Sequence, residues 1–393
     1  MNADPKNFAR IADRMNDIAP FHVVEIFNRV GDLERAGHSI VNLCIGEPDF
    51  PTPQPMLDAA AKALQSGRFP YTPSLGISVL REAIAKFYWD RYQVNIAPER
   101  IAVTAGASAA LLLTMGVLIN PDDEVLLTDP GYPCNHQFVR VMGGKPVGVP
   151  VDSSSGYQLN ADLIAQHWKR ESVAALVASP ANPTGTMIHA DAMGKLINAV
   201  HGRGGRMIVD EIYLALSYGQ EGNSVLSISD EVFVINSFSK YFQMTGWRLG
   251  WIVAPSAYVK AIERLSQNLF IANSAIAQQA ALAGFEPATL EILEARRREF
   301  QTRRDYLIPA LKDLGFGIPV APEGAFYVYA DCAKFTGDSY RFAWDLLEQA
   351  HVAVTPGIDF GTHHANRHVR FSYCASLEQL REGVARLKRF LVR

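Results

Sequence analysis

Short apolar runs alternate with amphipathic segments over most of the chain. Apolar runs bounded by glycine, proline or polar residues predict buried strands, which are expected at 40–45, 101–103, 124–128, 144–151, 173–178, 207–210, 232–235 and 251–254. Apolar residues at helical spacing predict helices, at 20–36, 78–92, 109–119, 161–169 and 190–201. Because strand and helix alternate from residue 45 to 285, this part is predicted to be an α/β domain with a mostly parallel sheet between helices.

The C-terminal part of the chain has a different pattern. Two long helical segments are predicted at 257–283 and 288–314, followed by strands at 325–329, 352–354 and 368–373 and helices at 340–350 and 377–391. This mixture predicts a smaller α+β domain, which the N-terminal helix is expected to join. The predicted division is a large domain of residues 45–285 and a small domain of residues 1–44 and 286–393.

The composition is that of a globular protein that can bury a sizeable core, since 48% of its 393 residues are hydrophobic and 20% are charged. The net charge of −3 provides no basic field to hold nucleic acid or an anionic membrane. The longest helical apolar run, 109–119, is too short to span a bilayer, and the charged first 20 residues lack the apolar core of a signal peptide. We expect a cytoplasmic enzyme with no nucleic acid or membrane partner.

Cysteine and histidine patterns argue against a metal site. The four cysteines lie far apart without a Cys-x-x-Cys pair and are expected to be buried small hydrophobic residues: Cys44, Cys134, Cys332 and Cys374. Three histidines have no carboxylate or cysteine at ligand spacing and are expected in a surface loop: His363, His364 and His368. The basic run 296–298 is expected to be a solvated helix face.

A polar loop between two predicted strands carries the strongest chemical indication. It runs from Ser237 to Trp251 and contains Lys240. A lysine in a partly apolar setting can have its pKa lowered, which makes a neutral amine available to condense with an aldehyde. The hydroxyls of Ser237 and Ser239 and the guanidinium of Arg248 suit a dianionic phosphate. An aldehyde that also carries a phosphate is pyridoxal phosphate.

The same loop resembles the cofactor-lysine signature of class I/II aminotransferases, which are pyridoxal-phosphate enzymes of fold type I. The resemblance rests on Ser-Phe-Ser-Lys at 237–240, followed eight residues later by Arg248 in Gly-Trp-Arg-Leu-Gly, and it covers the chain from about Val23 to the C-terminus. It implies that Lys240 is the Schiff-base residue and Arg248 a phosphate ligand. It also implies a large domain with a mostly parallel sheet of the seven-stranded type, beside a smaller α+β domain.

Four further residues take their expected roles from the resemblance. Gly46, in Gly-Glu-Pro-Asp-Phe, would contact the substrate through its backbone, although the local chemistry fits a plain proline turn equally well. Tyr132 would stack on the pyridine ring. Arg370 would bind the substrate's α-carboxylate through its guanidinium fork. Tyr71 would reach the cofactor phosphate of a neighbouring subunit, which implies a homodimer with shared active sites.

The turn after the predicted strand 101–103 is a further candidate phosphate site. Gly106, Ala107 and Ser108 lead from this strand into a helix, where free backbone N–H groups and the positive end of the helix dipole favour an anion. No Gly-x-Gly-x-x-Gly motif is present here, which counts against a dinucleotide-binding fold.

The ends of two other predicted strands supply polar groups. Asn182, held between prolines in Pro-Ala-Asn-Pro-Thr-Gly, would donate to the cofactor's phenolic oxygen, and Tyr213 can reach the same oxygen. Asp210 can keep the pyridine nitrogen protonated by pairing with it. Because ligands of parallel sheets bind beyond the carboxyl ends of the strands, these residues are expected to meet Lys240.

The resemblance implies an aminotransferase that uses an L-amino acid and a 2-oxo acid. A pyridoxal-phosphate C–S β-lyase on the same fold stays open, because both reactions start from the same carbanion. A ligand-binding protein without turnover is disfavoured by the presence of Lys240, Asp210, Asn182 and Tyr213. In the subgroup that the sequence resembles, aspartate-preferring members place a lysine at the position of Ser108, which cannot form the same ion pair. Unless another cation replaces that lysine, we expect a neutral donor such as alanine, a branched-chain or an aromatic amino acid, with 2-oxoglutarate or pyruvate as acceptor.

Overall fold

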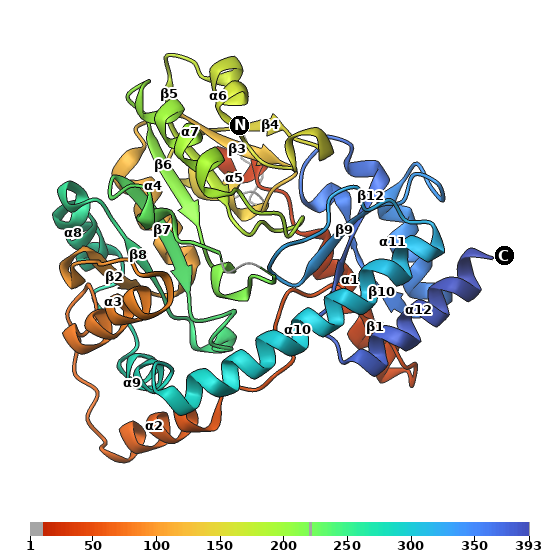
Figure 1. Cartoon of the computed structure of the whole chain (residues 1–393), viewed down its shortest axis with the longest axis horizontal. Helices are drawn as coiled ribbons and strands as arrows, with labels where there is room; N and C mark the ends of the chain where they lie inside the picture. Colours follow the sequence, from red (N-terminus) through yellow and green to blue (C-terminus); the bar gives the residue numbers. More distant parts are fainter. Residues whose placement is uncertain (1–10, 220–221, 393) are drawn as a thin grey trace, which may run out of the picture.

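The computed structural model describes residues 11–219 and 222–392. Figure 1 shows a larger part around a central sheet and a smaller part that holds the C-terminus, with the long helix α10 (Pro287–Leu314) running from one to the other. Residues 1–10 of the predicted small domain lie outside the described residues. The division between domains at residues 285 and 286 stays a prediction, since α10 extends along both parts.

The central sheet has seven strands in the order β2-β8-β7-β6-β5-β3-β4. β8 runs antiparallel to its neighbours β2 and β7, and the other strands all point the same way. The mostly parallel sheet of seven strands is therefore confirmed. Its strands are β2 (Ile101–Thr104), β3 (Glu124–Asp129), β4 (Lys145–Pro150), β5 (Ser172–Ala178), β6 (Arg206–Asp210), β7 (Val232–Ser237) and β8 (Gly250–Val253).

Both faces of this sheet are buried, because alternate residues of a strand enter two different apolar cores. In β7, Val232 and Val234 enter one core, and Phe233 and Ile235 enter the other. Helices cover the first core with α3 (Ser78–Tyr92), α6 (Ala161–His167) and α7 (Ala190–His201), and the second with α4 (Gly106–Leu118), α5 (Cys134–Val141) and α8 (Val259–Leu269). The carboxyl ends of the parallel strands are left as one open edge.

The smaller part is built on two short sheets. An antiparallel sheet has the order β11-β12-β9, with β9 (Tyr327–Asp331), β11 (Thr355–Pro356) and β12 (His368–Ser372), while β1 (Val41–Asn42) pairs in parallel with β10 (Val352–Ala353). Three helices pack against these strands, namely α1 (His22–Arg35), α11 (Ser339–Ala350) and α12 (Leu377–Leu391). The smaller α+β unit expected from the sequence is thus present.

Three helical predictions need correction. The predicted segment 257–283 is two helices, α8 and α9 (Ala275–Ala283), separated by Ile271, whose φ of 63° cannot continue a helix. α4 begins at Gly106 rather than at residue 109. The pattern does not predict α2 (Gln54–Gln65), because its start is rich in proline. A proline in the first helical turn loses no helical hydrogen bond, so the proline-rich segment does not exclude a helix.

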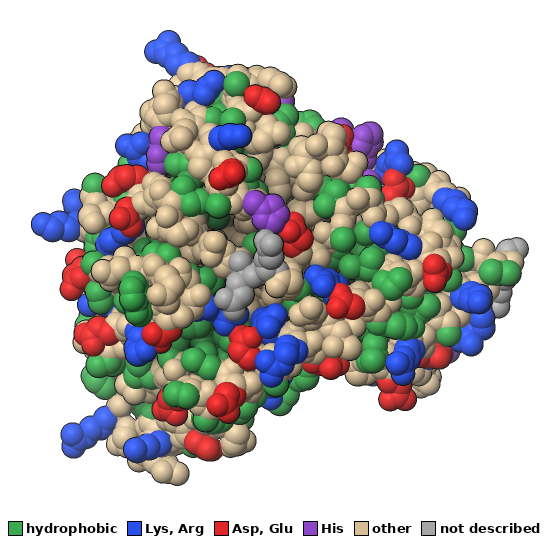
Figure 2. All heavy atoms as spheres, in the orientation of Figure 1, with side chains coloured by type: hydrophobic (Ala, Val, Ile, Leu, Met, Phe, Trp, Pro, Cys, Tyr) green, Lys and Arg blue, Asp and Glu red, His purple; other side chains and the backbone are tan. Residues whose placement is uncertain are grey.

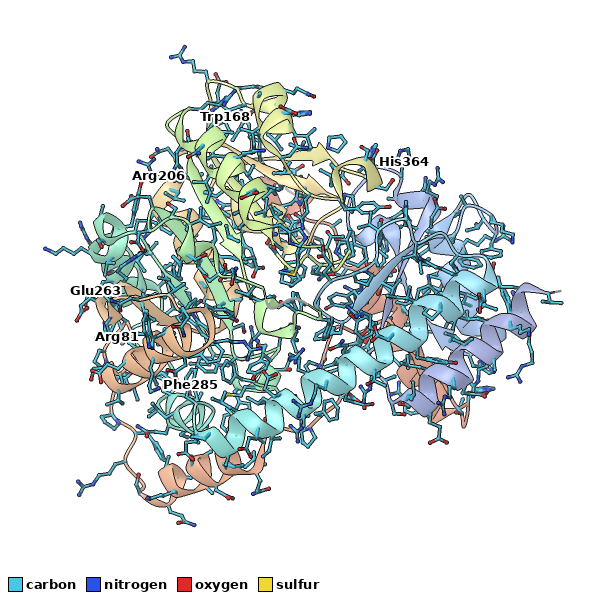
Figure 3. The ribbon with its side chains drawn as sticks, viewed as in Figure 1. Arg81, Trp168, Arg206, Glu263, Phe285 and His364 are labelled. Atoms are coloured by element: carbon cyan, nitrogen blue, oxygen red, sulfur yellow. The ribbon has the colours of Figure 1, made fainter. Side chains whose placement is uncertain are left out.

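The prediction of a histidine surface loop is wrong for His368. This side chain is buried in β12, where its ring stacks on Tyr329 with centroids 4.5 Å apart. His364 is exposed at the outer edge of the smaller part (Figure 3). No group of histidine, cysteine or acidic side chains within the described ranges is arranged to hold a metal ion.

The prediction of a solvated arginine face is also wrong for most of the run. Arg298 is exposed, but Arg297 is mostly buried and pairs with Glu294 at 2.7 Å. Arg296 lies over the ring of Phe50 at 5.2 Å. Of the cysteines, Cys134 is partly exposed and the other three are buried as expected.

Figure 2 shows acidic and basic side chains interspersed over the visible face of the molecule. Among the helices that the structure describes, none is long and apolar enough to cross a membrane. The compartment stays a prediction.

Candidate active site

A cavity of about 410 Å³ opens at the carboxyl edge of the central sheet, between the larger and the smaller part. All the candidate residues except Gly106 and Tyr71 line it. The larger part contributes Ala107, Ser108, Tyr132, Asn182, Asp210, Tyr213, Ser237, Ser239, Lys240 and Arg248, and Gly46 and Arg370 complete the candidates. Residues from five separate strand ends are therefore brought to one place, as the parallel sheet requires.

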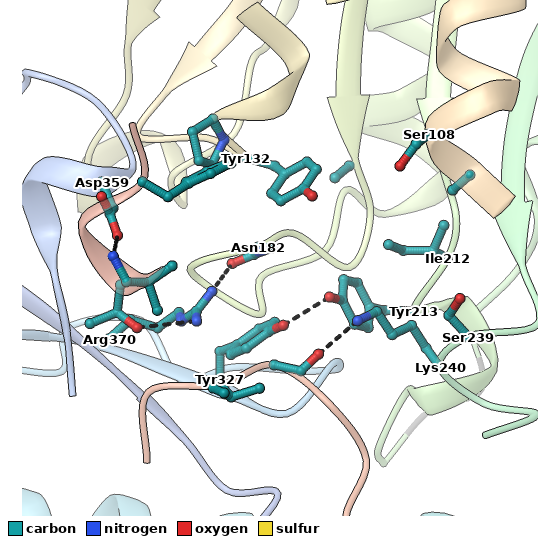
Figure 4. Close-up of a pocket in the computed structure, with 18 of the residues that line it drawn as sticks. Ser108, Tyr132, Asn182, Ile212, Tyr213, Ser239, Lys240, Tyr327, Asp359 and Arg370 are labelled. Atoms are coloured by element: carbon teal, nitrogen blue, oxygen red, sulfur yellow. Dashed lines mark hydrogen bonds between the residues drawn. The ribbon is translucent and has the colours of Figure 1, made fainter. Parts of the chain in front are cut away.

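Lys240 follows β7 and extends into this cavity (Figure 4). Its ammonium donates to the carbonyl oxygen of Gly46 at 2.7 Å and lies 5.8 and 5.7 Å from the ring centres of Tyr213 and Phe326. Burial disfavours the charged form and lowers the pKa of Lys240 to about 8, below its ordinary value of 10.5. A neutral amine is thus accessible in this cavity near physiological pH.

Asp210 ends β6 and is buried at the base of the cavity. Its Oδ1 accepts from the backbone N–H of Ile212 at 3.1 Å. Burial raises the pKa of Asp210 to about 7, above its ordinary value of 3.8. A carboxylate in this position is stabilised by any cationic N–H group that a ligand brings to it.

The start of α4 and the guanidinium of Arg248 form one cradle. α4 begins at Gly106, so the first backbone N–H groups of the helix have no partner within it. Gly106 has φ 79°, and a Cβ there would lie 2.6 Å from Nη2 of Arg248. The missing side chain lets the arginine approach the helix start, and the cradle therefore combines a guanidinium with a helix N-terminus, which suits a dianion.

Two serines complete this side of the cavity. Ser237 donates from Oγ to the carbonyl oxygen of Leu249 at 3.3 Å and accepts from the N–H of Ser239 at 3.0 Å. These bonds fix the turn that carries Lys240, while the hydroxyl of Ser239 faces the cavity.

Arg370 lies on β12 at the opposite wall. Its guanidinium donates to Oδ1 of Asn182 at 2.8 Å, to the carbonyl oxygen of Cys44 at 2.6 Å and to the hydroxyl of Thr355 at 3.2 Å. Its Nε is buried and has no hydrogen-bond partner within the described residues. The guanidinium carbon of Arg370 lies over the ring of Tyr327, 4.3 Å from the ring centre. A buried donor without an acceptor is costly, so this fork is suited to a ligand carboxylate.

Tyr327 is a site residue that the sequence reasoning misses. Its hydroxyl lies 2.9 Å from that of Tyr213 (Figure 4), and its ring underlies Arg370. A Cβ at Gly46 would collide with the Tyr327 hydroxyl, which gives this glycine a packing role beside the cavity. The predicted strand 325–329 contains three aromatic residues, and the pattern alone could not tell which of them faces the site.

Apolar side chains that line the cavity are also missed as site residues. Phe21, Val24 and Phe27 of the first helical segment line it, together with Leu111 and Phe360. The sequence predicts an amphipathic helix here, but not that one edge of its apolar face borders a ligand cavity.

Tyr71 is not brought to the cavity of its own chain. It is 84% exposed and lines a separate surface depression together with Phe69 and Ile276. A role for Tyr71 at an active site would therefore need a second subunit.

Comparisons with known proteins agree with the geometry. The family model described as aminotransferase class I and II matches residues 38–387. The chain is 35% identical to a (5-formylfuran-3-yl)methyl phosphate transaminase of Methanocaldococcus jannaschii, over 97% of this chain and 99% of the relative. It is 33% identical to a valine–pyruvate aminotransferase of Mycobacterium tuberculosis, over 95% and 97% of the two chains. The solved structure of aspartate aminotransferase from Thermus thermophilus with maleate superposes with a TM-score of 0.91 at 33% identity, covering 97% of this chain and all of the other.

Proposed function

The chain belongs to the class I and II aminotransferases, and from that premise we propose that it moves the amino group of a neutral, apolar L-amino acid to a 2-oxo acid. It is an aminotransferase, and its cofactor is pyridoxal phosphate. The substrate class and the individual role of each residue are the proposal. Its main support is the apolar lining of the cavity beside Arg370.

The residues of the cavity fit the cofactor. The cradle of Gly106, Ala107, Ser108 and Arg248 would hold a phosphate, with the serine hydroxyls 237 and 239 beside it. When bound, pyridoxal phosphate supplies an aldehyde that condenses with amines and a ring that accepts the electrons of a bond broken at the substrate's α-carbon. Burial raises the pKa of Asp210 and so disfavours its charged form, and a protonated pyridine nitrogen would stabilise the carboxylate as a cationic partner.

The phenolic side of the cofactor would face two donors. Asn182 and Tyr213 both line the cavity between Arg370 and Lys240, and Tyr327 holds the Tyr213 hydroxyl by a hydrogen bond. Tyr132 would present its flat face to the ring. These side chains would fix the orientation of the ring relative to Lys240.

Lys240 is proposed as the general base. Its Nζ would take the proton from the substrate's α-carbon and later return it, since a pKa of about 8 lies close to the operating pH. Gly46 would hold the amine near the reacting centre by its carbonyl oxygen, which accepts from Nζ at 2.7 Å. Arg370 would bind the α-carboxylate and so place the α-proton within reach of Lys240.

A neutral donor is supported by the charges of the cavity. Among its described lining residues, the cations are Lys240, Arg248 and Arg370, and each already has a role toward the cofactor or the α-carboxylate. A second carboxylate would therefore enter without a cation from this chain, at a desolvation cost. The same reasoning favours pyruvate over 2-oxoglutarate as acceptor.

The relatives are named for different substrates, which include valine with pyruvate as well as aspartate. Ser108 supports the neutral class, because the family resemblance implies a lysine at this position in aspartate-preferring members and a serine hydroxyl cannot form that ion pair. The C–S β-lyase reaction remains the second candidate, since Lys240 and Asp210 would serve its first step equally well.

The visible absorption spectrum of the holoenzyme tests both candidates. Single amino acids are added without a keto acid, and loss of the yellow colour with leucine or alanine, but not with aspartate, is the expected result. A colour change with aspartate alone would contradict the neutral class. Persistent colour with release of pyruvate and ammonia from a cysteine conjugate would establish the lyase instead.

We further propose a homodimer with shared active sites. Tyr71 is 84% exposed, and its neighbours Phe69 and Leu64 are 46% and 54% exposed, so this face presents apolar surface that a second copy could cover. Light scattering of the purified protein is expected to give twice the mass of the chain, and a value equal to one chain would contradict the dimer.

A further inference from the structure

α1 has two apolar edges with different surroundings. Ile26 and Val30 are buried in the core of the smaller part. Val24 and Phe27 remain 50% and 48% exposed and line the active-site cavity together with Phe21, which precedes the helix. Phe21, Val24 and Phe27 thus form an apolar wall of the cavity. The position of the first turn of α1 determines where this wall lies.

The first turn of α1 is held by a carboxylate from a distant part of the chain. Asp359 accepts from the N–H of His22 at 2.9 Å and from the N–H of Val23 at 2.7 Å, and Figure 4 shows Asp359 beside this turn. The residue before the helix, Phe21, provides no side-chain cap. Asp359 thus satisfies two backbone donors that the helix leaves open.

Asp359 is itself fixed to the central sheet. Two residues on, Gly361 packs against the carboxylate of Asp129, the last residue of β3. Asp129 accepts from the N–H and the hydroxyl of Thr362 at 2.9 and 2.8 Å. Next to Asp359, Phe360 accepts from the N–H of Gly131 at 2.8 Å and packs over Arg370 at 4.8 Å. The segment from Asp359 to Thr362 therefore joins the sheet, the proposed carboxylate-binding Arg370 and the start of α1.

We propose that Asp359 is a positioning residue that determines specificity, because it holds the first turn of α1 so that Phe21, Val24 and Phe27 form a wall against the substrate side chain. This inference rests on the proposed apolar donor. Asp359 itself lines the cavity, and the inference assigns selection of side-chain size to the helical turn that its carboxylate holds, not to a contact of that carboxylate with the substrate. A long apolar side chain would bury surface against the wall, whereas the methyl group of alanine would bury little.

The inference is tested by the ratio of kcat/KM for leucine to that for alanine in the holoenzyme. In Asp359→Ala this ratio is expected to fall about tenfold, mainly through KM for leucine, since one to two methylene contacts in an apolar pocket are worth about that much. Asp359→Asn keeps one acceptor oxygen and is expected to give a smaller fall. If the alanine variant does not fold, the asparagine variant carries the same test.

Glu348→Gln is the matched control. Glu348 pairs with Arg29 of α1 at 2.6 Å, away from the cavity, so its loss loosens α1 without moving the proposed anchor, and the ratio is expected to stay unchanged. An unchanged ratio in the Asp359 variants, or an equal fall in Glu348→Gln, would overturn this inference and leave the proposed function intact. A wild-type enzyme that prefers aspartate to leucine and alanine would overturn the proposed function and this inference with it.

Discussion

Replacing Lys240 with alanine is expected to lower kcat by about 10⁴-fold, the upper end of the contribution of a general base, while pyridoxal phosphate stays bound. Among the described residues that line the cavity, Lys240 is the only lysine. The remaining cations are guanidinium groups, which do not deprotonate in proteins and cannot take a proton from the α-carbon. The cradle at Arg248 and the carboxylate of Asp210 are unaffected by the change, so cofactor affinity should persist.

Single-turnover absorbance changes with leucine measure this effect directly, and equilibrium dialysis measures the bound cofactor. Lys260→Ala, in the exposed part of α8, is the matched control and is expected to retain full activity. Wild-type turnover in Lys240→Ala would refute the role proposed for this lysine. Loss of both turnover and cofactor would show that Lys240 contributes mainly to cofactor binding.

The sequence predicts the candidate site well where the fold leaves few alternatives. Asp210, Asn182 and Lys240 each follow an apolar run that becomes a parallel strand, and parallel strands end at one edge of a sheet. Their meeting in one cavity follows from strand direction and needs no knowledge of side-chain packing. α7 and α12 have the predicted limits because the apolar spacing of each is uninterrupted.

Site contacts between residues far apart in the sequence could not be predicted in this way. Asp359 is 336 residues from its partner Val23, and Tyr327 is 114 residues from Tyr213. No local pattern encodes such pairs, since each depends on how the two parts of the molecule pack. The direction of β8 is likewise open in the sequence, because an apolar run predicts a strand without its orientation.

The exposure of arginine side chains is also hard to predict from the sequence. A run of three consecutive arginines in a predicted helix favours a solvated face, yet Arg296 lies over Phe50 and its guanidinium donates to the backbone of Pro51 at 2.7 Å. The long arginine stem can pack along apolar surface while its head finds an acceptor. Charge alone is therefore a weak predictor of exposure for arginine.

Replacing Arg370 with lysine is expected to raise KM for the amino acid about 100-fold, which corresponds to about 3 kcal/mol. Lysine keeps the positive charge but has no planar fork, so it cannot replace the bonds to Asn182 and Cys44 and also offer a paired donor to a carboxylate. The packing over the Tyr327 ring would be lost as well. Cofactor affinity should stay near the wild-type value, because Arg370 lies on the wall opposite the phosphate cradle.

Steady-state kinetics with leucine and with alanine separate this effect from a change in side-chain selection. Arg370→Lys is expected to raise KM for both donors by the same factor, because both carry the α-carboxylate, whereas the Asp359 variants should affect leucine more. Arg367→Lys is the matched control, since Arg367 lies three residues away, outside the cavity, and pairs with Asp331 at the surface. An unchanged KM in Arg370→Lys would remove this arginine from the substrate site, and the buried Nε would then need another acceptor to offset its desolvation.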